Sequence, residues 1–552
     1  MFMTVKNVFS ILPYMPTINI SKVWKQIQSP DFNPARDANL VEQVKKAAVS
    51  STKPAKVSFG TSGWRGEIGT EFTLKNIQVV AKAILQVYRE ADAQTFEALG
   101  VGSFEELKEK GIVLGHDNRL LGKEFCEVVA DQFIKAGIKV YYGGEMPTPE
   151  FSAAIESLGA ACSVNITPSH NPSNYNGIKF NPADGGPAGP EITNKITQNS
   201  NTLMKTHVWE APGNINWETI DPIKIYKNFS EKQGTIKYGR ILSLLSKESI
   251  DLVCDHVHGS TRGRPTAMLN NPQCLTSLRT ETDPLFGGVT PEPSSKNLAG
   301  VRQVLDASKS RFKLGAIFDP DGDRIRFYDG TREIDMNSFG AIAFHYMVTW
   351  RKEEGVLAKS VATSNFANII AAKLGIPVME TPVGFKNFRP WLKRNANPKA
   401  LIAFEESDGI TGLNNTLEKD AMFGLLIALE IMAVTGKNLG EYLDLLYAEY
   451  GRLYPERSGF EVDKSLIGEP LMARVAEIAK SAQPGSKIAI GKKNKVVSEL
   501  LTIDGVKIIF HDDSWMLVRP SGTEPKVRIY AECRNPEEKD EMFATAKALF
   551  FK

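Results

Sequence analysis

Residues 111–172 read GIVLGHDNRLLGKEFCEVVADQFIKAGIKVYYGGEMPTPEFSAAIESLGAACSVNITPSHNP. Short apolar runs alternate here with longer segments whose apolar residues recur every three or four positions. That alternation predicts a strand–helix–strand–helix–strand series. Alternating strands and helices favour an α/β sheet, in which ligand sites lie at the carboxyl ends of strands. The last predicted strand runs directly into Ser169.

Two later blocks repeat this alternation, and each ends in a polar loop. They run from SIDLVCDHV (249–257) through AGVRQVLDASKS (299–310) to KLGAIFD (313–319), and from SVATSN (360–365) through FANIIAAKLG (366–375) and VMETPVG (378–384) to ALIAF (400–404). The C-terminal part instead places two helical segments, 471–482 and 536–550, around several strands. We therefore expect three consecutive α/β domains with mixed sheets plus a C-terminal α+β domain, arranged around a central cleft.

At 552 residues the chain is long enough for three or four domains. The expected parts are an N-terminal extension (1–56), domain 1 with the Ser169 loop (57–210), domain 2 with an aspartate loop (211–325), domain 3 (326–440) and domain 4 (441–552). In the extension, the spacing of NLVEQVKKAAV (39–49) predicts a helix. A hinge for domain 4 is expected near residues 436–450.

The loop ITPSHNP (166–172) presents one hydroxyl, Ser169, between two prolines and beside His170. A strand that ends in such a turn can hold a side chain clear of the backbone, as covalent chemistry requires. An ordinary serine turn could give the same seven residues. Three further loops distinguish the two interpretations.

The loop AIFDPDGDR (316–324) follows an apolar strand and carries Asp319, Asp321 and Asp323. Three carboxylates this close repel one another, so a folded protein keeps them together mostly where a cation offsets the charge. Oxygen ligands with open positions suit Mg²⁺. An EF-hand calcium loop would need Gly and Glu where Arg324 and Gly330 stand, so that interpretation fails.

The remaining loops carry groups suited to a sugar phosphate. RPSGTEPKVRIY (519–530) combines arginines, hydroxyls and a glycine, which suits a phosphate dianion. AFEESDG (403–409) follows the strand ALIAF, and Glu405 and Ser407 there can hydrogen-bond sugar hydroxyls. Taken alone, a basic surface turn and a solvated acidic loop would explain these two strings.

Together these motifs resemble the α-D-phosphohexomutases, the family of phosphoglucomutases and phosphomannomutases. The resemblance covers nearly the whole chain after about residue 56, with the motifs in matching order. The other matching strings are FGTSGWRG (59–66), GHDNR (115–119), NGIKF (176–180), TPVGFKNF (381–388) and LEKDA (417–421).

The resemblance implies that Ser169 carries a phosphoryl group and that Mg²⁺ is held by Asp319, Asp321 and Asp323, with Ser169 completing the site. It implies proton transfer and charge stabilisation by Arg65, Lys179 and His170. The residues implied to bind a hexose phosphate are Arg324, Lys386, Glu405, Ser407, Arg519, Ser521, Gly522, Thr523 and Arg528. A hexose 1,6-bisphosphate would be both intermediate and activator. We expect the pKa of Lys179 to be depressed by neighbouring cations, which would let it act as a base.

The strings TPVGFKNF and LEKDAMFGLLIALEIMA are more similar to phosphoglucomutase segments, which implies interconversion of glucose 1-phosphate and glucose 6-phosphate. A phosphomannomutase or a dual-specificity enzyme is the alternative. Phe404 stands where much of the family has Gly, Asp408 follows the Ser of that loop, and Trp64 replaces a common His, which leaves the stringency of sugar selection open.

Two rivals come from other classes. FDPDGD after an apolar strand also resembles a haloacid-dehalogenase-like aspartyl-phosphate motif, with Asp319 as nucleophile, but that leaves Ser169 without a role. A catalytically silent scaffold is the other rival, and it conflicts with a site in which every chemical position is filled.

Composition restricts the partners. A net charge of +2 gives no bulk attraction to nucleic acid or anionic membrane, so we expect neither as a partner. Five cysteines without a CxxC pattern suggest free thiols, and we expect a cytoplasmic monomer or homodimer. The start of the chain lacks a basic region and a cleavage site typical of signal peptides.

Overall fold

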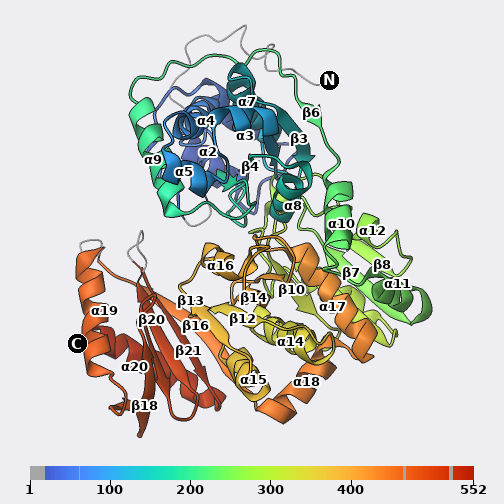
Figure 1. Ribbon diagram of the computed structural model, residues 1–552, viewed down its shortest axis with the longest axis vertical. Coiled ribbons are helices and arrows are strands. Elements are labelled where there is room, and N and C mark those ends of the chain that lie inside the picture. Colours follow the sequence, from blue (N-terminus) through green and yellow to red (C-terminus); the bar gives the residue numbers. More distant parts are fainter. Residues whose placement is uncertain (1–18, 61–62, 464–467, 521–525, 552) are drawn as a thin grey trace. The chain divides into compact units, whose positions relative to one another are not determined.

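The computed structural model describes residues 19–60, 63–463, 468–520 and 526–551 (Figure 1). The chain forms two compact units. Unit 1 comprises Met1–Glu333 and Asn414–Glu430, and unit 2 comprises Ile334–Leu413 and Ile431–Lys552. The described residues of each unit contain two β-sheets.

The first sheet of unit 1 is mixed. Its spatial order is β1 (Trp64–Glu67), β5 (Tyr175–Pro182), β4 (Cys162–Ile166), β2 (Ile112–His116), β3 (Val140–Glu145) and β6 (Glu218–Thr219). The strand β2 runs parallel to β3 and β4, whereas β5 returns antiparallel to β4 and pairs with β1. The connection between β4 and β5 is the Ser169 loop, at the carboxyl end of β4.

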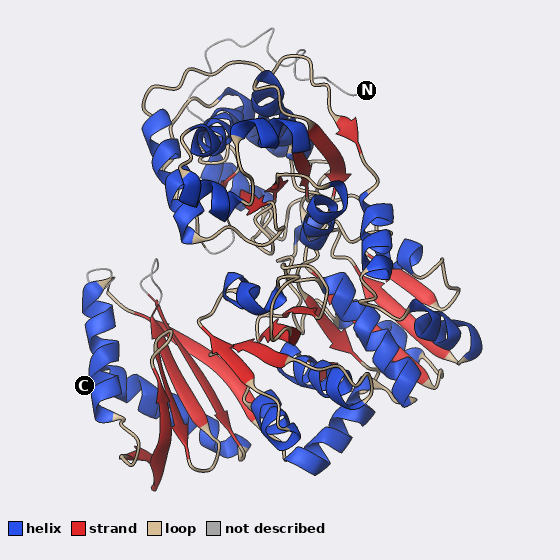
Figure 2. Cartoon of the chain, viewed as in Figure 1, coloured by secondary structure: helices blue, strands red, loops and turns tan. Residues whose placement is uncertain are grey.

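Helices cover both faces of this sheet (Figure 2). Alternating apolar side chains of β2 pack against them. Ile112 and Leu114 belong to a core with α4 (Leu74–Arg89), α7 (Gly122–Lys135) and α9 (Pro190–Leu203). Val113 points to the other face, where α8 (Thr148–Leu158) and α10 (Pro222–Lys232) pack together. The predicted strand–helix series is therefore confirmed.

The described part of the N-terminal extension folds onto this domain as two helices, α2 (Ile20–Ile27) and α3 (Ala38–Ser50). The helix predicted over 39–49 is thus confirmed. Trp24 is fully buried, and its Nε1 donates to the Ile68 carbonyl at 2.9 Å. The apolar cluster around it also takes in Leu120 and Leu285, so the helix pair packs on two parts of unit 1.

The second sheet carries the aspartate loop. Its order is β11 (Glu333–Ile334), β10 (Ile325–Tyr328), β9 (Phe312–Phe318), β7 (Ile250–Asp255) and β8 (Leu275–Leu278). Because β10 is antiparallel to β9, the aspartate loop is the turn of a hairpin. The helix α13 (Ala299–Ala307) covers one face through Val301 and Leu305.

In unit 2, a four-stranded sheet has the order β13 (Val378–Thr381), β12 (Val356–Ser360), β14 (Ala400–Glu405) and β15 (Gly409–Gly412). The strand expected at SVATSN is wrong: the strand ends at Ser360, and residues 361–365 form the loop before α15 (Phe366–Leu374). The helix α14 (Met336–Thr349) packs on β14 and on α18 (Leu439–Tyr450), whereas α17 (Ala421–Thr435) begins in unit 1 and ends in unit 2. Most of the segment expected to be a hinge is therefore helical.

The C-terminal sheet has the order β16 (Tyr454–Glu461), β21 (Lys526–Cys533), β20 (Trp515–Pro520), β19 (Val506–Phe510), β18 (Lys493–Leu501) and β17 (Lys487–Ile490). Met516 and Val518 face the helices α19 (Glu469–Ser481) and α20 (Lys539–Phe551). Leu517, on the opposite face, packs in a cluster with Val361 and Ala362, which follow β12. This contact joins the two sheets of unit 2.

The remaining helices are short: α5 (Ala93–Leu99), α6 (Phe104–Lys110), α11 (Tyr238–Lys247), α12 (Arg264–Met268), α16 (Arg389–Leu392) and the 3₁₀ turns Phe286–Gly288, Phe385–Phe388 and Pro536–Glu538. Among the described residues no single helix is long and apolar enough to cross a membrane; α17 and α18 pass that test only as a pair bent by 73°. The predicted α/β fold class is confirmed. The domain boundaries and the shared cleft stay predictions.

Candidate active site

Ser169 lies in the loop after β4 with its side chain almost fully buried. Its backbone adopts the left-handed conformation (φ 58°), which costs a non-glycine residue free energy and marks positions held by their surroundings. The hydroxyl donates to Asp319 Oδ2 at 3.0 Å, and the amide donates to Thr167 Oγ1 at 3.0 Å. The predicted serine and the first predicted aspartate therefore meet.

A buried arginine holds the loop in this shape. The guanidinium of Arg119 donates to the carbonyl oxygens of Ser169, Asn171, Pro172 and Tyr175. Its Nε pairs with Asp117 at 3.1 Å, and the face of the guanidinium lies 4.8 Å from the ring centre of Phe286. Because a lysine has no planar fork, only arginine can satisfy so many carbonyls at once.

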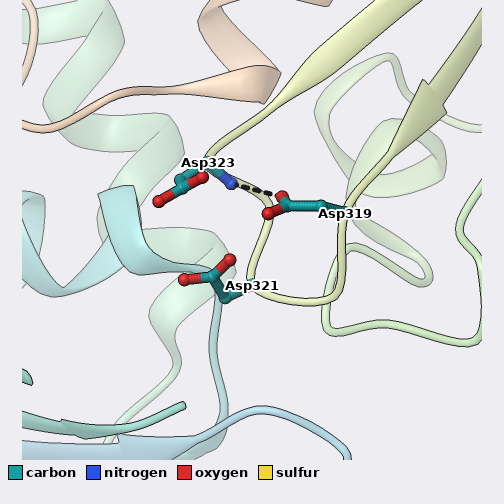
Figure 3. A group of neighbouring side chains, drawn as sticks. All are labelled: Asp319, Asp321 and Asp323. Atoms are coloured by element: carbon teal, nitrogen blue, oxygen red, sulfur yellow. Dashed lines mark hydrogen bonds between the residues drawn. The ribbon is translucent and has the colours of Figure 1, made fainter. Parts of the chain in front are cut away.

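The three aspartates gather in the β9–β10 turn (Figure 3). One carboxylate oxygen from each lies within 4.8 Å of the others, and all three residues are buried. Asp319 Oδ1 accepts the amide hydrogens of Asp323 and Arg324, each at 3.0 Å.

These carboxylates fit a divalent cation. Oδ1 of Asp321 and Oδ1 of Asp323 are buried and have no hydrogen-bond partner among the described residues. Burial, followed by the charges of Asp321 and Asp323, raises the pKa of Asp319 well above its usual value. A hard oxygen-binding ion such as Mg²⁺ would satisfy the two buried oxygens and offset the repulsion.

Two lysines border the aspartates. Lys179 Nζ lies 2.6 Å from Asp321 Oδ2 and 3.3 Å from Asp323 Oδ2, and Lys419 Nζ lies 3.1 Å from Asp323 Oδ2. The expected depression of the Lys179 pKa is wrong. Burial alone would lower this pKa, but the carboxylates of Asp321 and Asp323 outweigh burial and raise it. The nearest charges to Lys179 are therefore anions.

Two arginines and a histidine complete the group in unit 1. His170 Nδ1 lies 3.4 Å from Ser169 Oγ, and Arg65 donates to Asn171 Oδ1 at 2.8 Å. Burial and then the charges of Arg324 and Arg65 lower the pKa of His170 to about 2. Burial and then the charge of Arg324 lower the pKa of Arg65. The predicted residues of unit 1 thus form one cluster, in which Ser169 lies between Asp319 and a histidine that feels the charges of Arg324, Arg65 and Lys419.

Of the predicted sugar and phosphate residues, Arg324 belongs to unit 1 and the others to unit 2. Glu405 ends β14, and its Oε1 accepts the Gly384 amide hydrogen at 2.7 Å, next to the turn that carries Lys386. Arg519 and Arg528 lie directly opposite each other on β20 and β21. Ser407 lies in the turn after β14. Ser521, Gly522 and Thr523 lie outside the described residues.

Sequence reasoning gave no role to Arg119, Lys419 or Thr148, whose Oγ1 donates to Asp321 Oδ2 at 2.7 Å. The strings GHDNR and LEKDA pointed to the first two. Their contacts are with backbone carbonyls and with a distant carboxylate, which no local spacing reveals.

Four family models match the chain in order. They describe the phosphoglucomutase/phosphomannomutase α/β/α domain I (residues 56–207), domain II (235–332), domain III (335–450) and C-terminal domain (469–548).

Two curated relatives span almost the same length. A phosphoglucomutase/phosphomannomutase of Thermococcus kodakarensis is 29% identical over 494 residues, which cover 87% of this chain and 95% of the relative. A phosphoglucosamine/phosphogalactosamine mutase of Sulfurisphaera tokodaii is 26% identical over 488 residues, covering 86% and 95%. The solved open form of pp63/parafusin, a phosphoglucomutase from Paramecium, superposes with a TM-score of 0.69 at 21% identity over 91% of this chain and 94% of that one, which shows a shared fold.

Proposed function

The chain belongs to the phosphoglucomutase/phosphomannomutase family, whose members are intramolecular phosphotransferases, and we propose that it interconverts glucose 1-phosphate and glucose 6-phosphate through a phosphorylated Ser169. A hexose 1,6-bisphosphate would be the intermediate, and it would also prime the enzyme. The observation that carries the proposal is the buried contact between the Ser169 hydroxyl and Asp319, one of the three clustered aspartates. The rival with Asp319 as nucleophile gives no reason for that contact.

Phosphoryl transfer needs alignment of the reacting oxygens and neutralisation of charge more than it needs covalent chemistry. Arg119 supplies alignment by binding the carbonyl oxygens of Ser169 and Asn171, which fixes the backbone that carries the Ser169 hydroxyl. Arg65, Arg324 and Lys419 supply positive charge around it. Asp319, Asp321 and Asp323 would hold Mg²⁺, which when bound offsets the charge of phosphoryl oxygens.

The other end of the substrate would be held by unit 2. Arg519 and Arg528, opposite each other on neighbouring strands, present two guanidinium groups that suit a phosphate dianion. Glu405 and Lys386 would contact the sugar hydroxyls. Because the bisphosphate must present each of its ends to Ser169 in turn, this grip has to accept either orientation.

The sugar that the enzyme accepts is the second part of the proposal. The relatives include enzymes named for glucose, mannose and glucosamine phosphates, so a phosphomannomutase or dual-specificity enzyme is the alternative. Steady-state kinetics with glucose 1-phosphate, mannose 1-phosphate and glucosamine 1-phosphate, each primed with the matching bisphosphate, would rank the three substrates.

The mechanism is tested by Ser169→Ala, with Ser173→Ala as the matched control in the same loop. We expect Ser169→Ala to lose turnover and to take up no label from ³²P-bisphosphate, because the group that accepts the phosphoryl is gone. Ser173→Ala should keep both. Turnover that persists in Ser169→Ala, or label found on a carboxylate that hydroxylamine releases, would exclude a phosphoserine enzyme.

A further inference from the structure

The turn between β18 and β19 contacts both substrate-binding parts of unit 2. Asp504 Oδ2 accepts a hydrogen bond from Arg519 Nε at 2.8 Å and another from the Val383 amide at 2.9 Å. Arg519 is one of the two arginines proposed to bind the phosphate, and Val383 belongs to the segment 381–388 that carries Lys386. One carboxylate oxygen thus joins two segments that are 136 residues apart in the sequence.

The close packing of the neighbouring Gly505 on β20 fixes the position of Asp504. The next residue, Gly505, has φ +90°, and a Cβ there would lie 2.4 Å from the Val518 carbonyl oxygen and 3.0 Å from the Arg519 Cα. Only glycine lets the turn press this closely on β20. The backbone of Asp504 is therefore fixed against the strand that carries Arg519.

The other partner of Asp504 is fixed equally well. Val383 packs in the apolar cluster with Leu517 and Tyr530, on the face of the C-terminal sheet that also carries Arg519. The adjacent Gly384 amide donates to Glu405 Oε1 at 2.7 Å. A continuous series of contacts therefore runs from Glu405 through the 383–384 backbone and Asp504 to Arg519.

Buried polar contacts hold the two sheets together behind this series. Lys507 Nζ donates to Glu380 Oε1 at 2.6 Å and to Asn365 Oδ1 at 2.9 Å, and Glu532 accepts the Asn365 amide hydrogen at 2.8 Å. Lys507 and Glu532 are fully buried. Since a buried charge that loses its partner is strongly destabilising, these contacts oppose sliding of one sheet against the other.

We propose that Asp504 is a positioning residue that sets the separation between the sugar-contacting segment 381–388 and the phosphate-gripping Arg519. The inference rests on the proposed function for the identity of the ligand. Fixing that separation lets unit 2 select hexose phosphates by the distance between their hydroxyl groups and the phosphate that is not transferred. Asp504 itself touches no substrate.

Two variants separate its two contacts. Asp504→Asn keeps an oxygen acceptor for the Val383 amide but removes the charge that orients Arg519, whereas Asp504→Ala removes both. We expect the KM for glucose 1-phosphate to rise about tenfold in Asp504→Asn with kcat little changed, and to rise further in Asp504→Ala. Asp513→Asn is the matched control, because it removes one charge from the exposed pair with Arg534 in the next turn.

A double-mutant cycle with Arg519→Lys tests whether the effect passes through Arg519. If it does, Asp504→Asn adds little to the KM of Arg519→Lys. If the effects of the two substitutions on KM were fully additive, the inference would be overturned. A decrease in kcat and in stability without a change of KM would also overturn it, because it would indicate a merely structural role.

Amide hydrogen exchange tests the inference independently of enzyme activity. Peptides covering 381–388 should exchange faster in Asp504→Ala than in Asp504→Asn, and Asp513→Asn should match the wild type. Unchanged exchange in Asp504→Ala overturns the inference whatever the activity. If exchange changes as expected but the wild type turns over no hexose phosphate, the proposed function fails and the positioning contact stands.

Discussion

His256 shows how one buried side chain makes the stability of unit 1 depend on pH. Its ring has no exposed surface and stacks on Phe318, the last residue of β9, at an interplanar angle of 12°. Nδ1 pairs with Thr261 Oγ1 at 2.9 Å. Burial, followed by the charges of Arg262 and Arg264, lowers the pKa of His256 to about 3.

An unfolded histidine has a pKa of about 6.5, so between about pH 6.5 and pH 3 the unfolded chain binds one more proton than the folded chain. The contribution of neutral His256 is complete above that window and is lost as the pH falls through it. Between pH 6.5 and pH 5, protonation of His256 in the unfolded chain should lower the free energy of unfolding of the wild type by about 2 kcal/mol. We predict that this part of the decrease is absent in His256→Gln. Urea unfolding in EDTA measures this, with the exposed His511→Gln as control. Equal slopes in the wild type and His256→Gln would contradict the prediction.

The candidate site was predictable from sequence wherever a polar loop follows an apolar strand. Ser169, Asp319 and Glu405 all come at the carboxyl ends of predicted strands, and the structure has each strand in place. Arg119 was not predictable, because its partners are backbone carbonyls, which every residue possesses. The prediction of a depressed pKa for Lys179 was wrong. The sequence spacing indicated that Lys179 lies near Ser169, but it could not show that the carboxylates of Asp321 and Asp323 contact the lysine.

At the scale of elements, the strand β12 was missed for a similar reason: its stabilising contacts come from residues outside the local sequence. Its sequence, VLAKS, includes Lys359, and a lysine ordinarily indicates an exposed position. Here Lys359 is fully buried and donates to the Thr363 carbonyl at 2.8 Å and to Asn365 Oδ1 at 3.2 Å. The following loop and Glu380 on β13, whose Oε1 lies 3.6 Å from Lys359 Nζ, make the buried charge tolerable. Such partners cannot be inferred from a five-residue pattern.

The helix α2 is the element whose contribution to stability is most easily tested. Its burial of Trp24, with the indole hydrogen bond to Ile68 and the link from Gln28 Nε2 to Asn174 Oδ1 at 2.8 Å, places it against the end of the Ser169 loop. We predict that Trp24→Ala lowers the free energy of unfolding by about 3–5 kcal/mol.

The comparison variant is Trp350→Ala, at a tryptophan with 47% of its surface exposed, which should cost about 1–2 kcal/mol because only half of the side chain is buried. Denaturant unfolding followed by circular dichroism compares the two variants. Similar small losses in both would mean that α2 is attached to unit 1 without stabilising it.

At the scale of the whole molecule, the two units should respond differently to Mg²⁺. All three aspartates lie in unit 1, whereas the residues proposed to bind the sugar and the phosphate, apart from Arg324, lie in unit 2. A ligand that binds only the folded state stabilises it by RT ln(1 + [L]/Kd), which is about 2.7 kcal/mol at a concentration one hundred times Kd. Each unit has its own apolar cores, so calorimetry can show separate transitions.

We predict that Mg²⁺ raises the melting temperature of the unit 1 transition and leaves that of unit 2 unchanged. The cause is the repulsion among three buried carboxylates, two of which keep an oxygen without a hydrogen-bond partner in the described part of the chain. Asp321→Asn should abolish the shift, because it removes one ligand charge. Sodium chloride at matched ionic strength controls for screening, which acts on exposed charges of both units. A shift that survives in Asp321→Asn, or that appears equally in both transitions, would place the ion elsewhere than on these aspartates.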